Sequence, residues 1–134
     1  MPHAEKVLIA GGTLNIALAF VIGFGLSRFR LRDPSRSPHY LLTAHEVALQ
    51  EGFMLLGLTF AVILSPLRAG LETVAASFLV ASSVFQVAAP LVNHAQGVQD
   101  QFAARSPGLT LATINAVLAS GGIAILVTGV LRGL

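Results

Sequence analysis

Four apolar stretches, each long enough to cross a bilayer, constrain this chain more than any other feature of its sequence. They cover residues 7–26, 40–64, 70–92 and 109–131. About 20 apolar residues in a helix span the hydrocarbon core. Only 10% of the residues are charged, against about 25% in soluble domains. We therefore predict an all-α fold, an integral membrane bundle of four transmembrane helices that forms a single domain over residues 1–134.

The first stretch has a second interpretation, a cleaved signal peptide. It is too long for the apolar core of an ordinary signal and has no clear cleavage site, so we expect a transmembrane helix. Pro66 and Pro107 fall in the predicted connections, where helix breaks belong. Pro90 lies near the end of the third stretch, and we expect it to bend or end that helix.

Basic residues indicate the orientation in the membrane. The two longer loops carry five of them, four arginines in residues 27–36 and Arg105, whereas the opposite side carries Lys6, Arg68 and Arg132. Loops rich in arginine and lysine face the cytoplasm. We predict a multi-pass protein of the bacterial inner membrane with periplasmic termini. The small net charge of +2 serves this orientation and indicates no nucleic-acid partner.

The chain has no cysteine, which excludes disulfides, thiolate metal sites and cysteine nucleophiles. It also has no H-E-x-x-H or E-x-x-H pattern of zinc and di-iron sites. A lone histidine inside a span remains compatible with an axial haem ligand.

The second span carries polar residues that are costly inside a membrane. Glu51 lies near the midplane, about 15 Å into the span, and His45 about 7 Å in, at about 1.5 Å per residue. Such residues normally face a bundle interior or a cavity. Glu51 is therefore a candidate functional residue, although a protonated Glu51 that only bonds a neighbouring helix is the structural alternative. His45 has a corresponding alternative as an interfacial histidine.

Amides on the other spans are expected at a similar depth. Gln86 and Asn93 share one stripe of the third span with Ser82, and Asn115 lies about 9 Å into the fourth. With the predicted topology, these amides, His45 and Glu51 all fall in the cytoplasmic half. Polar groups that converge from several helices indicate a binding site. His45 and Glu51 point about 120° apart around their helix, which a ligand at a subunit interface of an oligomer would satisfy.

The opening segment Pro2–Gly12, the four-span layout and the length resemble hydroxylaminobenzene mutase. That family rearranges hydroxylaminobenzene to 2-aminophenol in bacterial nitroarene breakdown. The resemblance implies an isomerase with a small aromatic hydroxylamine as substrate.

A more distant resemblance is to styrene oxide isomerase, a four-span membrane enzyme. Its second span has Ala-His, five residues, then Asn-Gly; here Ala44-His45 precedes Glu51-Gly52 by the same spacing. The resemblance implies that His45 ligates haem b in a homotrimer and that Asn93 matches a Gly-Asn pattern. Glu51 replaces the asparagine of the pocket, and Ala89 stands where that family has a tyrosine, so tyrosine-assisted chemistry is not expected.

These observations predict roles for the candidate residues. Haem iron on His45 would be a Lewis acid, and Glu51 would transfer protons because desolvation favours its neutral form. Gln86, Asn93 and Asn115 would orient the substrate, and Leu49, Phe53 and Phe85 would hold its ring. The alternatives are an epoxide isomerase, a haem-binding electron carrier, and a non-catalytic membrane subunit or small transporter.

Overall fold

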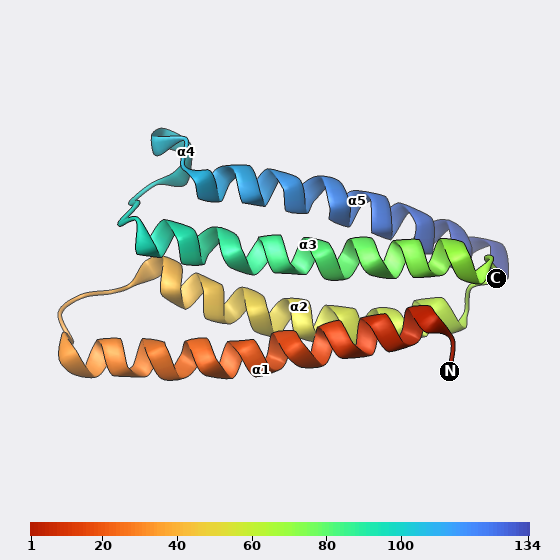
Figure 1. Ribbon diagram of the computed structural model, residues 1–134, viewed down its shortest axis with the longest axis horizontal. Helices are drawn as coiled ribbons and strands as arrows, with labels where there is room; N and C mark the ends of the chain where they lie inside the picture. Colours follow the sequence, from red (N-terminus) through yellow and green to blue (C-terminus); the bar gives the residue numbers. More distant parts are fainter.

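The structure is a computed structural model that describes residues 1–134. Its four long helices are α1 (His3–Arg32), α2 (His39–Ile63), α3 (Ala69–Ala95) and α5 (Pro107–Gly133), and a single short turn of helix, α4 (Gln101–Ala104), precedes α5. All four long helices are long and apolar enough to cross a membrane. Figure 1 shows them side by side, with both termini at one end of the bundle and α4 at the other. The prediction of an all-α, four-span membrane protein is confirmed.

Each predicted span lies within its helix except that α2 ends one residue before the predicted residue 64. The extra turns lie at the helix ends, where polar residues continue the hydrogen bonding beyond the apolar core. Pro90 does not end α3, because the helix continues through it to Ala95. Since proline has no N–H, the carbonyl of Gln86 lacks its usual helical donor at residue 90.

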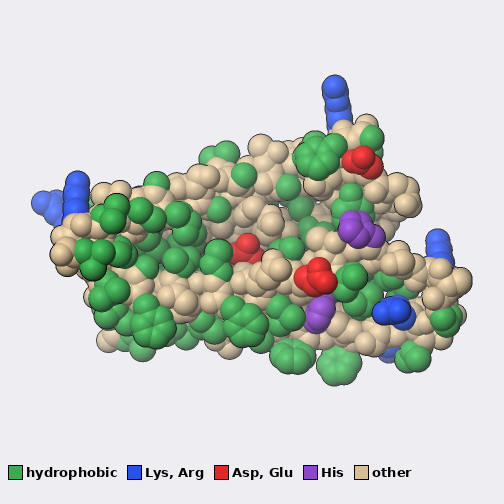
Figure 2. All heavy atoms as spheres, turned by 180° about the vertical axis from the view of Figure 1, so that it is seen from behind, with side chains coloured by type: hydrophobic (Ala, Val, Ile, Leu, Met, Phe, Trp, Pro, Cys, Tyr) green, Lys and Arg blue, Asp and Glu red, His purple; other side chains and the backbone are tan.

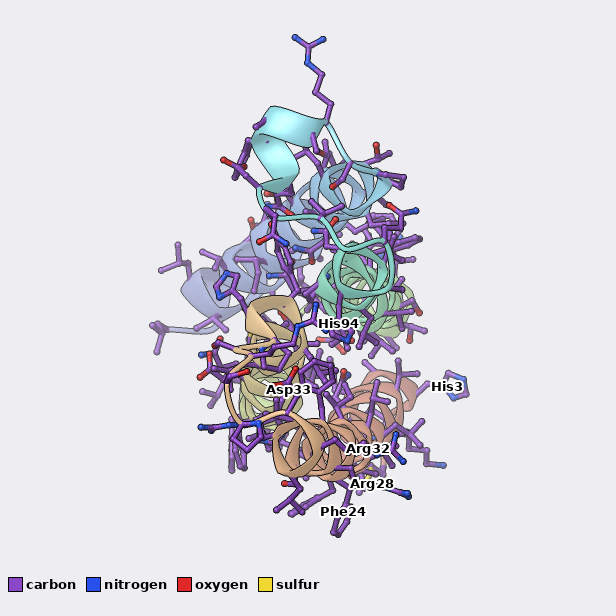
Figure 3. The ribbon with its side chains drawn as sticks, turned by 90° about the vertical axis from the view of Figure 1, so that its left-hand side faces the viewer. His3, Phe24, Arg28, Arg32, Asp33 and His94 are labelled. Carbon is purple, nitrogen blue, oxygen red and sulfur yellow. The ribbon has the colours of Figure 1, made fainter.

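The helices pair as α1 with α2 and α3 with α5, and the two pairs meet where α3 contacts both α1 and α2. α1 and α5 lie on opposite sides of the central pair, so the bundle is open (Figure 3). Glycines allow the closest approaches. A Cβ on Gly12 would lie 2.8 Å from the carbonyl oxygen of Gly52, and one on Gly122 would lie 3.0 Å from that of Ala75. Small residues thus let the helices approach closely at Gly12 and Gly122.

Two apolar clusters fill the bundle interior. The first occupies the end that holds the termini and the second the opposite half. The first consists of Ala4, Leu8, Leu55, Val62, Ala75, Ala76, Leu79 and Leu126, and the second of Ala19, Ile22, Ala44, Ala48 and Val87.

Side-chain caps shape the loop that leads into α5. Asp100 accepts hydrogen bonds from the backbone N–H groups of Phe102 and Ala103 at 2.8 and 3.2 Å, which starts α4. Ser106 caps α5 by accepting from Leu109 N at 3.3 Å, and Pro107 occupies the first helical position, where no N–H is needed. α4 was not predicted from the sequence. Asp100 is nevertheless a typical N-cap residue for α4, and Ser106 followed by Pro107 is a typical start for α5.

Candidate functional site

A layer of polar side chains separates the two apolar clusters. Between the first and the second cluster lie Asn15 on α1, Glu51 on α2 and Ser83 on α3. Asn15 Nδ2 donates to Ser83 Oγ at 2.9 Å, which joins α1 to α3 in this layer. Gln86 lies one turn beyond Ser83, and its partner Asn115 extends the layer to α5. We call these five residues the polar layer.

Glu51 lies on the buried face of α2. It follows buried Ala48 by three residues and precedes buried Leu55 by four, which places all three on one side of the helix. Its Oε2 is enclosed and has no hydrogen-bond partner. No arginine or lysine lies in the middle of any span to pair with it. An enclosed polar atom without a partner costs about 1–3 kcal/mol, and a hydrogen bond from a ligand to this oxygen would offset that cost.

Gln86 and Asn115 form a direct pair between α3 and α5. Asn115 Nδ2 donates to Gln86 Oε1 at 2.5 Å. Both side chains are half-buried, and neither Gln86 Nε2 nor Asn115 Oδ1 has another protein partner. The backbone carbonyl of Gln86, which Pro90 leaves without its helical donor, adds a further acceptor on the same turn. The pair therefore keeps both a donor and acceptors for a ligand.

Asn93 lies apart from the polar layer, at the end of α3. It is fully buried and ties the following loop to the helix. Its Nδ2 donates to Gln101 Oε1 at 2.9 Å, and its Oδ1 accepts from Ser106 Oγ at 2.7 Å. Tyr40 Oη accepts from the backbone N–H of Gln101 at 3.0 Å, which fixes the same loop to α2. The contacts of Asn93 are those of a loop anchor, and they could not be predicted from the sequence pattern.

His45 faces α1 at the level of the second apolar cluster. Its Nδ1 lies 2.8 Å from the carbonyl oxygen of Ala19, and since that oxygen only accepts, Nδ1 carries the proton and donates. Nε2 has no hydrogen-bond partner in the protein. A Cβ on Gly23 would lie 3.0 Å from His45 Cε1, so the glycine makes room for the ring. A shallow pocket of about 270 Å³ beside the ring is lined by Phe20, Phe24 and other α1 residues.

The outward face of α2 also carries polar residues at membrane depth. Glu46 and Gln50 are one turn apart and both exposed. Figure 2 shows acidic and histidine side chains on this side of the molecule, in the middle of its otherwise apolar length. Charged and amide groups are costly against lipid, which makes this face a poor lipid contact. Of the predicted ring-binding residues, Phe53 is exposed, whereas Leu49 and Phe85 are half-buried.

The loop end of the bundle holds a separate cavity of about 430 Å³. Its lining includes Phe29, Arg36, Tyr40 and His94. His94 contacts Phe29 edge to face, with ring centroids 5.9 Å apart, and it lies near the centre of this end in Figure 3, whereas Phe24 points away from the bundle. None of the predicted site residues lines this cavity.

Glu72, near the start of α3 and four residues after Arg68, is a buried carboxyl at the end of the bundle that holds the termini. Its side chain is only 6% exposed, and its Oε1 is enclosed without a partner. It makes no ion pair with Arg68. Glu72 lies in the first turn of α3 and faces inward toward the first apolar cluster, next to Ala75 and Ala76.

No group of three or more His, Asp or Glu side chains is placed to hold a metal ion through protein ligands alone. His45 is the only histidine well inside a span, because His3 and His39 begin their helices and His94 lies near the end of α3. Comparison with known proteins gives no match to a family model, to a curated protein or to a solved structure.

Proposed function

We propose that this protein is a membrane-embedded isomerase that moves the hydroxyl group of hydroxylaminobenzene from nitrogen to the ortho ring carbon and yields 2-aminophenol. The observation that carries the proposal is the enclosed, unpartnered Oε2 of Glu51 within the polar layer. A neutral, apolar arene with one polar N–OH group suits a site of this kind, apolar on both sides and polar in the middle.

Glu51 supplies the proton transfers that this rearrangement needs. A neutral Glu51 gives its proton to the substrate oxygen as the N–O bond breaks, and the oxygen departs as water. The same oxygen bonds to the ortho carbon and returns one proton to the Glu51 carboxylate. The ring proton of that carbon ends on nitrogen, so that atoms, protons and electrons balance. The apolar clusters on either side limit access of bulk water, which would add at other ring positions.

The Gln86–Asn115 pair orients the N–OH group. Gln86 Nε2 offers a donor, and Asn115 Oδ1 and the Gln86 carbonyl offer acceptors. A hydroxylamine both donates and accepts, so it matches the pair. Placement of the oxygen near the ortho carbon lowers the barrier because the migrating group does not have to diffuse.

The environment of His45 fits a haem ligand. Metal-ligating histidines commonly donate their second ring N–H to a carbonyl or carboxylate, and His45 Nδ1 donates to Ala19 O. That bond leaves Nε2 as the ligating atom. Haem bound there would supply Lewis acidity toward the substrate oxygen. The residues of this chain that would hold it are His45, Ala19 and the apolar Phe20 and Phe24.

A homotrimer is the assembly we propose, with the site completed between subunits. His45 faces the α1 side of α2, whereas Glu51 faces the bundle interior, so a single subunit does not bring them to one point. Exposed Glu46 and Gln50 are costly against lipid and favour a neighbouring subunit on this face. The pocket beside His45 is open, which leaves room for a contribution from a second copy.

The experiment is a direct assay of the purified, full-length chain with hydroxylaminobenzene, carried out in water labelled with heavy oxygen. The proposal predicts 2-aminophenol whose oxygen comes from the substrate and carries little label. Production of 4-aminophenol with solvent oxygen at the rate of a protein-free control would contradict it. An absorbance spectrum of the same sample tests the haem independently of turnover.

A further inference from the structure

A groove between α1 and α3 lies on the side of the bundle away from the outward face of α2. It has a volume of about 260 Å³, and its lining is apolar except for Asn15. Leu14 and Val84 form its exposed edges, and Val80, Ala88 and Leu91 form its wall. The groove shares no lining residue with the pocket beside His45, so the two are separate surfaces.

The hydrogen bonds of Asn15 fix which of its atoms remains free. Nδ2 lies 3.0 Å from the carbonyl oxygen of Gly11, which can only accept, so the orientation of the amide is settled. The second N–H of Nδ2 goes to Ser83 Oγ at 2.9 Å. Ser83 Oγ in turn gives its own proton to Val80 O at 2.8 Å. Both donors of Asn15 are therefore used within the protein.

Asn15 Oδ1 is left as an acceptor without a protein partner. The only side-chain atoms that are both fully enclosed and without a partner are Glu51 Oε2 and Glu72 Oε1. Asn15 Oδ1 has no partner either, so it is not fully enclosed and reaches the surface, although Asn15 as a whole is only 7% exposed. The surface that Asn15 lines is the groove. Because both N–H groups of Asn15 are used within the protein, its side chain can accept a hydrogen bond from a ligand but cannot donate one.

We propose that this groove binds a neutral, apolar small molecule that carries one hydroxyl or N–H donor, with the donor on Asn15 Oδ1. Lipid acyl chains fill apolar grooves but have no donor to offer, so they leave this acceptor unpaired in a low-dielectric medium. Arenes with a hydroxyl or amino group have the required chemistry. The assignment depends on the Asn15 and Ser83 geometry alone and stands whether or not the chain is an isomerase.

The test compares two ligands of similar size on the purified, full-length chain by fluorine NMR. 4-Fluorophenol has a donor and 4-fluoroanisole has none. We expect saturable binding of the phenol that is about tenfold tighter than that of the anisole, the contribution of one hydrogen bond. Asn15→Leu should remove the difference between the two ligands. Equal binding of both ligands to the unaltered chain would overturn the proposal and leave only partition into an apolar surface.

A filling variant locates the binding. Ala88→Phe adds a ring to the groove wall and should abolish saturable phenol binding, whereas Ala124→Phe, on the exposed surface of α5, should leave it intact. Retained binding in Ala88→Phe would contradict the proposal. A change of oligomer mass in Ala88→Phe alone would also contradict it, because the groove would then be a subunit contact.

One further control separates this site from the proposed catalytic site. Glu51→Gln should bind 4-fluorophenol as the unaltered chain does. Loss of binding in Glu51→Gln would place the ligand at Glu51 and overturn the groove assignment. If the unaltered chain fails to turn over hydroxylaminobenzene but still binds 4-fluorophenol, the proposed function alone is overturned.

Discussion

Asn115 Nδ2 donates a 2.5 Å hydrogen bond to Gln86 Oε1, and this bond joins α5 to α3 within the polar layer. In a membrane, such a pair satisfies two amides that lipid cannot. It also holds a donor and an acceptor in fixed positions, one turn along α3 from Ser83. The same contact thus stabilises the bundle and prepares a polar site in its middle.

The glycine contact between α1 and α2 should control stability. Gly12→Ala places a Cβ 2.8 Å from the carbonyl oxygen of Gly52 and from Leu56 Cγ, so the helices must move apart. We expect a loss of about 1–3 kcal/mol in the free energy of unfolding, measured by reversible unfolding in mixed micelles. Gly57→Ala is the matched control, because nothing lies within 4 Å of its new Cβ. Equal stability of the two variants would show that α1 and α2 do not approach closely at Gly12.

The cap of α5 should contribute to stability as well. Ser106→Ala removes the acceptor for Leu109 N and the donor to buried Asn93 Oδ1. A lost cap costs about 1 kcal/mol, and the unpaired amide adds to that loss. Thr110→Ala, an exposed change one turn later, should have little effect on the same unfolding measurement. A Ser106→Ala variant as stable as Thr110→Ala would mean that the loop anchor is not formed.

His45→Ala should lose haem and activity together. The variant has no Nε2 to ligate iron, so the Soret band of the purified protein should disappear, and added imidazole should restore part of it. His94→Ala is the control, since His94 lies at the loop end and contacts Phe29, and it should keep the band. A full Soret band in His45→Ala would assign the haem ligand to another residue.

The orientation can be tested because the chain has no cysteine of its own. Ser35→Cys and Leu134→Cys place single thiols at exposed positions on opposite ends of the bundle. The basic loops predict that an impermeant reagent labels Leu134→Cys, and not Ser35→Cys, in intact cells with a permeabilised outer membrane. The reverse pattern would invert the topology.

The four helices could be predicted because hydrophobicity and length dictate transmembrane helices with little help from tertiary contacts. Glu51 lies between the two apolar clusters along α2, and its depth in the membrane stays a prediction. Its inward direction follows from its spacing to Ala48 and Leu55, which the sequence also contains.

The pairing of the polar residues could not be predicted, because it depends on which helices are neighbours. Gln86 and Asn93 share a stripe of α3, yet Gln86 pairs with Asn115 in the membrane and Asn93 with Gln101 and Ser106 in the loop. The burial of Glu72 was likewise missed, since a carboxyl near a helix start and an arginine resembles an exposed ion pair. The hydrogen bond from His45 to Ala19 could not be predicted either, because it depends on the relative rotation of α1 and α2.

The most direct test of the central claim, that Glu51 transfers protons in catalysis, compares turnover of hydroxylaminobenzene by Glu51→Gln and Glu46→Gln. Both changes remove one carboxyl from α2 and keep its size, but Glu51 Oε2 is enclosed without a partner and Glu46 is exposed. We predict that Glu51→Gln assembles normally and forms 2-aminophenol about 100-fold more slowly, while Glu46→Gln stays within a few-fold of the unaltered protein. Near-normal turnover in an assembled Glu51→Gln protein would contradict the claim and reduce Glu51 to a structural residue.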